Sequence, residues 1–383
     1  MVTLTTTPGD WQPIGNDFEF GFTISASGDG ADLVYSIGYQ LFDEDDTEIT
    51  ELEQIPYSSG EQFVNFARDI KPYIYTTLQD PGAEPTLDFD ANFGRGFYVR
   101  YGQIEFDSAN CTTETSGVGT SSDQYEAMNC AFQWWEDYSA FASGDMTVLS
   151  DRPAENYVTA DQDIFLHIFR DVTDNLIVFR LNYDSAGNQI GSTELLTEVS
   201  QGAHVHAVSA FPDDPLHVGL ARWRILVNET LGDTTIKTYN FTIRQCGDSP
   251  IRELHWIEPK GTQSSLVFED VVIGGNQAAG STFETRVPRG LTNVQRGKDY
   301  GLSRSNVRGL KRVTFRSVMD QVDGLEVWLD GLFSSRQHYV KYPVSGSYIL
   351  AKFVLDDGGY ETYNENQLAV TVAGTIHIPI NAL

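Results

Sequence analysis

Alternating apolar and polar residues dominate the first part of the chain. A period of two is typical of half-buried antiparallel strands. Strands with this pattern, some with bulky aromatic faces, are predicted over 17–25, 33–43, 96–106 and 129–141. Between 59 and 78 the apolar spacing becomes helical, and Pro72 limits the helix to one or two short turns. The pattern predicts a β-sandwich with a short helical insert over residues 1–146.

Shorter strands follow at regular intervals. Apolar stretches recur about every ten residues and are separated by turn residues, as in small sandwich domains. They lie at 163–171, 175–195, 204–210, 217–228 and 235–246. The second of these contains the turn sequence DSAGN, so it reads as two strands. Residues 147–246 are therefore predicted to form an immunoglobulin-like or fibronectin-like β-sandwich.

The remaining residues, 247–383, combine strands with the clearest helical pattern in the chain. After an irregular glycine-rich segment, 311–317 reads as a strand. The stretch 318–333 predicts a helix, because its apolar residues share one stripe. These residues are Val318, Val322, Leu325, Trp328, Leu329 and Leu332. Ser317 and Asp320 resemble a capping box at its start. Three more strands complete an α+β module in which one helix closes a small sheet or open barrel.

The segment 251–270 contains two apolar runs around a Pro-Lys-Gly-Thr turn. Leu254 and Trp256 alternate with His255, so they share one face of a strand. We expect Leu254 and Trp256 to supply apolar area at a joint between the sandwiches and the last module. His255 is expected to be packed or hydrogen-bonded at that joint rather than catalytic.

The net charge of the chain restricts the partners that it can bind. The chain has 54 acidic and 25 basic residues, for a net charge of −29. Such a surface repels nucleic-acid phosphate, so direct nucleic-acid contact is not expected. An acid-rich, lysine-poor surface suits salty surroundings, where counterions screen self-repulsion; ordinary solubility is the alternative. No apolar run approaches the roughly 20 residues that cross a bilayer, and no signal peptide is expected at the N-terminus.

Residues that carry chemistry are scarce. His204 and His206 could bind a metal from one face of a strand, but no third ligand lies at a diagnostic spacing, so two solvent-facing histidines on a strand edge are expected instead. Carboxylate pairs occur by chance among so many acids. The nucleophile-elbow, P-loop, zinc-protease and dinucleotide motifs are absent from the sequence. We therefore expect no enzyme activity, no cofactor and no metal.

A basic segment, 286–316, stands out against this acidity. Only Asp299 opposes its nine bases. They are Arg286, Arg289, Arg296, Lys298, Arg304, Arg308, Lys311, Arg312 and Arg316. We expect a docking arm that meets an acidic surface on another subunit. The alternatives are that it covers acidic faces of its own chain or contacts DNA.

The chain also resembles a family of virion structural proteins from tailed phages and prophages of Bacteroidetes. The resemblance is a pattern spread over nearly the whole length. It is read in 98–106, 148–153, 183–192, 246–270 and 300–340. Members are described as tail or virion proteins, and the order strand, helix, hairpin near the C-terminus is similar to the split barrel of tail-tube and distal-tail proteins. The chain departs from the family in its acidity and in Gly324 within the predicted helix.

The resemblance implies a virion structural subunit, and we expect it in the tail tip, baseplate or hub region. Its partners would be copies of itself in a ring and other virion proteins. A head-tail connector, or a capsid decoration or fibre protein, is the alternative within the virion. An array of host-glycan-binding modules, using exposed aromatics such as Trp134 and Trp135, is the alternative from another class.

Overall fold

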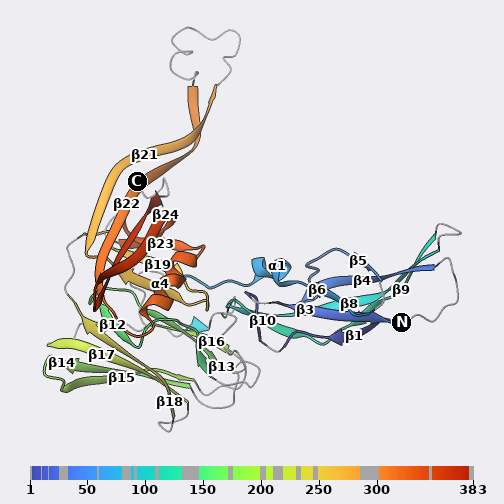
Figure 1. Cartoon of the computed structure of the whole chain (residues 1–383), viewed down its shortest axis with the longest axis horizontal. Coiled ribbons are helices and arrows are strands. Elements are labelled where there is room, and N and C mark those ends of the chain that lie inside the picture. The colour runs from blue at the N-terminus through green and yellow to red at the C-terminus, as the bar shows by residue number, and fades with distance from the viewer. Residues whose placement is uncertain are drawn as a thin grey trace.

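A computed structural model shows a mainly β protein, as the strand pattern predicts (Figure 1). It describes residues 2–9, 11–15, 17–25, 33–57, 60–79, 88–89, 93–107, 112–131, 146–170, 176–198, 204–209, 219–229, 234–244, 249–284, 302–344 and 347–378. No helix among these residues is both long and apolar enough to cross a membrane. The finer likeness to immunoglobulin, fibronectin or split-barrel domains stays a prediction, as do the boundaries at 146/147 and 246/247.

Two sheets near the N-terminus share one core, and we call them the N-terminal sandwich. The first has the order β1-β3-β6, with β1 at Val2–Thr6, β3 at Glu19–Ile24 and β6 at Gln62–Asn65. The second has the order β2-β10-β8-β4-β5, with β9 on β8; its strands are β2 (Gln12–Pro13), β4 (Leu33–Asp43), β5 (Glu53–Pro56), β8 (Gly94–Asp107), β9 (Thr112–Ser121) and β10 (Tyr125–Met128). Edge-to-face phenylalanines such as Phe18, Phe20 and Phe97 fill the space between the sheets.

The predicted helical insert is short, as Pro72 requires. It consists of α1 (Ala67–Ile70) and a single 3-10 turn at Lys71–Tyr73. Ile70 is fully buried against the N-terminal sandwich. The insert therefore adds apolar area to that core without forming a separate layer.

A second pair of sheets forms what we call the central sandwich. One sheet has the order β11-β13-β16-β7, with β7 at Asp88–Phe89, β11 at Thr147–Val148, β13 at Phe165–Arg170 and β16 at His204–Ser209. The other has the order β12-β18-β17-β14-β15, with β12 at Glu155–Val158, β14 at Leu176–Asp184, β15 at Gln189–Glu198, β17 at Leu220–Glu229 and β18 at Thr234–Ile243. Trp223, Tyr239 and Phe241 belong to the shared core. Because β7 comes from before residue 146 yet pairs with β16, the two sandwiches are linked by backbone hydrogen bonds.

The last part is a seven-stranded sheet, here called the C-terminal sheet. Its order is β20-β19-β23-β24-β25-β22-β21, with β19 at Glu253–Ile257, β20 at Gln263–Val267, β21 at Asp270–Glu284, β22 at Leu302–Asp320, β23 at His338–Val344, β24 at Ser347–Asn364 and β25 at Gln367–Ile378. The helix α4 (Leu325–Ser334) covers one face. Its buried Trp328 packs on Trp256 of β19, with ring centroids 5.0 Å apart.

The predicted helix start at residue 318 is wrong. Val318 pairs with Ala369 in the ladder between β22 and β25, and α4 begins only at Leu325. Gly324 is not inside the helix but is its N-terminal cap residue, with φ of 79°. Such a positive φ suits glycine and lets the chain turn sharply from strand to helix. Ser317 and Asp320 are strand residues, so they form no capping box.

The described parts of the glycine-rich segment before residue 311, up to 284 and from 302, are also more regular than predicted. There β21 and β22 pair as a long antiparallel hairpin. β25 accompanies β22 only from Gly309 onward, so beyond that point the two strands pair with each other alone. We call this part, 279–284 with 302–308, the ribbon. Figure 1 shows it extending away from the rest of the C-terminal sheet.

Candidate functional site

The turn between β19 and β20 is where all three parts of the molecule meet. Ala131 of the N-terminal sandwich donates its backbone N–H to the Pro259 carbonyl at 2.8 Å. The Thr76 hydroxyl donates to the Gly261 carbonyl at 2.5 Å. On the other side, the Thr262 hydroxyl donates to the Leu149 carbonyl, at the start of the central sandwich. The Pro-Lys-Gly-Thr turn therefore fixes the joint.

Residues 149–164 begin beside that turn and run along the edge strand β20, which they cover. The Gln162 side-chain amide donates to the Ser265 carbonyl at 2.9 Å, and the Ser265 hydroxyl donates to the Asp163 carbonyl. All five residues of β20 are buried. An uncovered edge strand invites pairing with other chains. This edge of the C-terminal sheet is closed.

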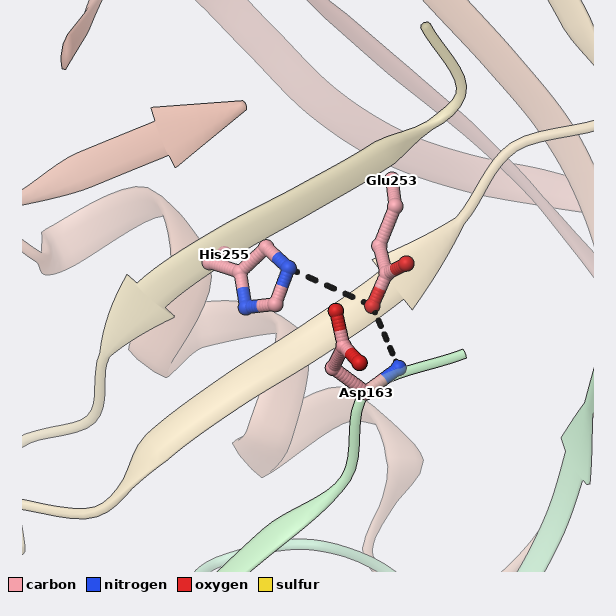
Figure 2. A group of neighbouring side chains, drawn as sticks. All are labelled: Asp163, Glu253 and His255. Atoms are coloured by element: carbon pink, nitrogen blue, oxygen red, sulfur yellow. Dashed lines mark hydrogen bonds and ion pairs between the residues drawn. The ribbon is translucent and has the colours of Figure 1, made fainter. Parts of the chain in front are cut away.

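Asp163 of this segment belongs to a buried ionic cluster, and Figure 2 shows it with two other members, Glu253 and His255. Lys341 of β23 places its ammonium nitrogen 2.7 Å from Asp163 Oδ2 and 3.2 Å from Glu253 Oε2. Glu253 Oε1 accepts the backbone N–H of Asp163 at 2.8 Å and lies 3.2 Å from His255 Nε2. The cluster joins the central sandwich to the C-terminal sheet through charges that are nearly excluded from water.

Burial and neighbouring charges shift the pKa values of two members of this cluster. Desolvation and the negative charge of Glu253 raise the pKa of Asp163. Burial alone would lower the pKa of Lys341, but the two carboxylates outweigh it and raise that pKa. Lys341 therefore stays protonated and holds two carboxylates together.

The same cluster contains metal-ligand types, because ligand atoms of Asp163, Glu253 and His255 lie within 4.8 Å of one another. The Lys341 ammonium already supplies the positive charge between the carboxylates. A divalent ion there would meet that ammonium at close range, which is strongly unfavourable in a buried place. The cluster fits a structural joint better than a metal centre.

A second buried carboxylate lies on the other side of β20. Glu258 accepts hydrogen bonds from the Asp151 backbone at 2.6 Å, the Trp328 indole at 2.9 Å, the Ser150 hydroxyl at 3.2 Å and the Ser264 hydroxyl. Desolvation, followed by repulsion from Asp151, raises its pKa to about 7. Glu258 links the start of the central sandwich to α4.

Arg152 completes this second cluster. Its guanidinium lies 4.7 Å from the centre of the Trp328 ring and donates to the Ser265 carbonyl at 3.1 Å. Burial lowers its pKa to about 10, against the opposing effect of Glu258. The polar groups around β20 are thus held by hydrogen bonds and ion pairs that position domains.

The predicted joint residues divide between two faces of β19. Leu254 and Trp256 point into the core of the C-terminal sheet, against α4. His255 and Glu253 face the central sandwich. The apolar pair therefore stabilises the last sheet, and the polar pair makes the joint. The sequence prediction did not include Asp163, Lys341 or Glu258. The available signal for a buried polar cluster was the presence of polar residues in the largely apolar strand Glu253–Ile257.

The other candidate metal residues lie elsewhere. His204 and His206 occupy β16, where they pair with Arg170 and Ile168 of β13. The predicted strand-edge position is wrong for His206, which pairs with Phe89 of β7 on the outer side of β16, whereas His204 lies beyond the two residues that pair with β7. Their side chains, like Trp134 and Trp135 and the cysteines Cys111 and Cys246, fall outside the described residues. Cys130 is a buried free thiol whose pKa is raised by desolvation.

The basic segment is divided by the hairpin. Arg286, Arg289, Arg296 and Lys298 fall outside the described residues. Arg304 and Arg308 lie on the ribbon, and Lys311, Arg312 and Arg316 lie on β22 within the sheet. Arg312 and Arg316 are exposed, and Lys311 lies 5.6 Å from the ring centre of Tyr342. Among the described carboxylates, none forms an ion pair with these last three bases.

Comparisons with known proteins add little. No protein-family model matches the chain, and no curated protein matches it. Among solved structures, a β-glucuronidase from Parabacteroides merdae is similar over 61% of this chain and 30% of its own, at 9% identity and a TM-score of 0.14. Similarity at that level supports no inference about fold or activity.

Proposed function

We propose that this protein is a structural subunit of a tailed-phage virion, in the tail tip, baseplate or hub region, that assembles with copies of itself into a ring. A head-tail connector or a capsid decoration or fibre protein remains the alternative within the virion. The role requires no cofactor and no catalytic group.

The ribbon is the observation that supports this proposal. It has two strands and no third strand beside it among the described residues. A two-stranded hairpin is at best marginally stable in water. A long hairpin that extends away from its own protein gains stability by packing against a neighbouring subunit. Each copy in a closed ring offers the same contact, so one such element serves every interface.

The buried joint supports the same role. Ion pairs and hydrogen bonds between the C-terminal sheet and the central sandwich, and hydrogen bonds from the turn to the N-terminal sandwich, hold the three parts in a set arrangement. A subunit that contacts several neighbours in an assembly needs such rigidity, because its contact surfaces must keep a fixed arrangement. The sequence resemblance to virion proteins points in the same direction.

Immunogold electron microscopy of phage particles from the source organism tests the virion role. An antibody raised against the full-length protein should label one fixed position, at the tail end, on intact particles. Labelling at the neck or over the head would support the connector or decoration alternative. Particles that carry no label, with the protein found only in the cell fraction, would contradict a virion role.

A further inference from the structure

The ribbon end of the C-terminal sheet carries an excess of basic residues. On the described residues of the ribbon, two residues are basic and one, Glu284, is acidic. Arg304 and Arg308 lie on the ribbon itself. Within the sheet, Lys311 and Arg312 continue the positive charge along β22. In a chain with a net charge of −29, this end is an exception.

The ribbon also has free backbone edges. β21 is the last strand in the order of the C-terminal sheet, and no described strand pairs with its outer side. The run Val271–Phe283 of β21 contains no charged residue. Charged side chains are a common protection for an edge strand. An unprotected edge beside basic residues offers both hydrogen-bonding groups and charge to a partner.

The opposite end of the same sheet is acidic. Here β22 ends, α4 begins, and β24 turns into β25, and the Gln321 backbone N–H donates to the Asn366 carbonyl at 2.8 Å. The carboxylates gathered there are Asp320, Asp323, Glu326, Asp330, Glu361 and Glu365. Among the described residues none of them forms an ion pair. Tyr360 donates to Asp330 at 3.0 Å, and its pKa is raised to about 12 by desolvation and then by that carboxylate.

These two ends cannot meet within one molecule. Arg308 and Asp320 lie on the same continuous strand, β22. At roughly 3.3 Å per residue, the strand separates them by about 40 Å. Any contact between the basic ribbon and the acidic end must therefore join two copies.

We propose that the basic ribbon of one copy docks on the acidic end of the C-terminal sheet of a second copy, so that subunits associate head to tail. The inference rests on the proposed assembly role and specifies its interface. Opposite charges steer the encounter and fix the orientation, while like ends repel each other. A head-to-tail contact uses two different surfaces, so it continues from copy to copy until a ring closes.

Variants that neutralise one end at a time test this interface. The ribbon variant carries Arg304→Gln and Arg308→Gln, and the acidic-end variant carries Glu361→Gln and Glu365→Gln. A matched control, Glu51→Gln with Asp123→Asn, removes two exposed carboxylates from the N-terminal sandwich. The wild type and the control should form the same oligomer in native mass measurements over a concentration series. Each end variant should need about tenfold more protein to assemble, because interface charge pairs contribute on this order.

A mixture of the two end variants gives the decisive result. Each retains one intact surface, so the ribbon of the acidic-end variant can bind the acidic end of the ribbon variant. The expected product is a one-to-one dimer that does not grow further. Large oligomers from either variant at wild-type concentrations, or no dimer in the mixture, would overturn the head-to-tail interface while leaving assembly itself intact. A wild type that stays monomeric throughout would instead contradict the proposed function, and this inference with it.

Discussion

The Lys341 ammonium nitrogen lies 2.7 Å from Asp163 Oδ2, although 178 residues separate them in the chain. Lys341 belongs to the C-terminal sheet, and Asp163 belongs to the segment that covers β20. The side chains of Lys341 and Asp163 are 11% and 4% exposed. The pair helps to hold the central sandwich against the C-terminal sheet, because either charge left alone in that place would be costly.

Replacing Lys341 by Met should therefore destabilise the protein by about 3–5 kcal/mol, the usual cost of removing one partner from a buried ion pair. Asp163 and Glu253 would keep two carboxylates side by side without a cation. Chemical denaturation of both proteins measures the difference. Lys352→Met is the matched control, because Lys352 lies on the neighbouring strand but is exposed. Equal losses in the two variants would mean that the buried pair does not stabilise the joint.

The carboxyl group of Glu258 should make stability depend on pH. Its pKa rises from an ordinary 4.5 to about 7 in the folded protein, so the folded state binds the proton more tightly than the unfolded state. Its contribution to stability is complete below pH 4.5 and is lost as the pH rises to about 7. Glu258→Gln removes this titration.

Thermal unfolding midpoints across that pH range provide the measurement. The midpoint of Glu258→Gln, relative to wild type, should increase steadily between pH 4.5 and 7. The variant should also show a pH-independent difference in midpoint, because the Asp151 N–H would lose its carboxylate acceptor. Glu51→Gln, at an exposed site, should follow the wild type. A relative midpoint that is flat with pH would show that Glu258 does not titrate in this range.

Gly261 should tolerate no side chain. Its φ is 89°, and a Cβ atom would meet the Asn129 carbonyl and the Phe93 ring of the N-terminal sandwich. Gly261→Ala combines backbone strain with overpacking and should cost about 2–5 kcal/mol. Gly324→Ala is the matched control: its φ is 79°, but the space around it is open, so strain alone should cost about 1–2 kcal/mol. Denaturant midpoints of the two variants would agree if the turn did not pack on the N-terminal sandwich.

Hydrogen exchange should distinguish the ribbon from the rest of β22. In dilute protein, the amides of 302–305 should exchange quickly, because only β21 protects them. Amides of 313–316 have strands on both sides and should exchange slowly. At concentrations that favour assembly, the first group should become protected while the second stays unchanged. Protection of the ribbon that is already complete in dilute protein would mean that it folds against its own chain.

Periodicity predicted many of the strands, because the alternation of apolar and polar residues along a half-buried strand is a local pattern. The strand predicted at 33–43 is β4, and the alternation of Leu254 and Trp256 places both in a core. The helix start failed because Val318 and Val322 fit a helical stripe, whereas pairing with β25 extends the strand through Asp320. Tertiary pairing overrode local spacing there.

The joint could be predicted only in part. The sequence pointed to His255 and to the turn that follows it, but it gave no reason to choose Asp163 among 54 acidic residues. A contact between positions so far apart depends on how β20 is covered, which no local pattern encodes. The basic segment was evident from charge, whereas its form as a two-stranded hairpin came from the pairing of β21 with β22.

The mass of the full-length protein in solution, measured by sedimentation over a range of protein and salt concentrations, tests the proposed assembly most directly. If copies assemble into a ring, a discrete oligomer several times the 42.6 kDa subunit mass should form as the protein concentration rises. A single species of 42.6 kDa at every concentration and every salt level would contradict the claim that this protein is a building block.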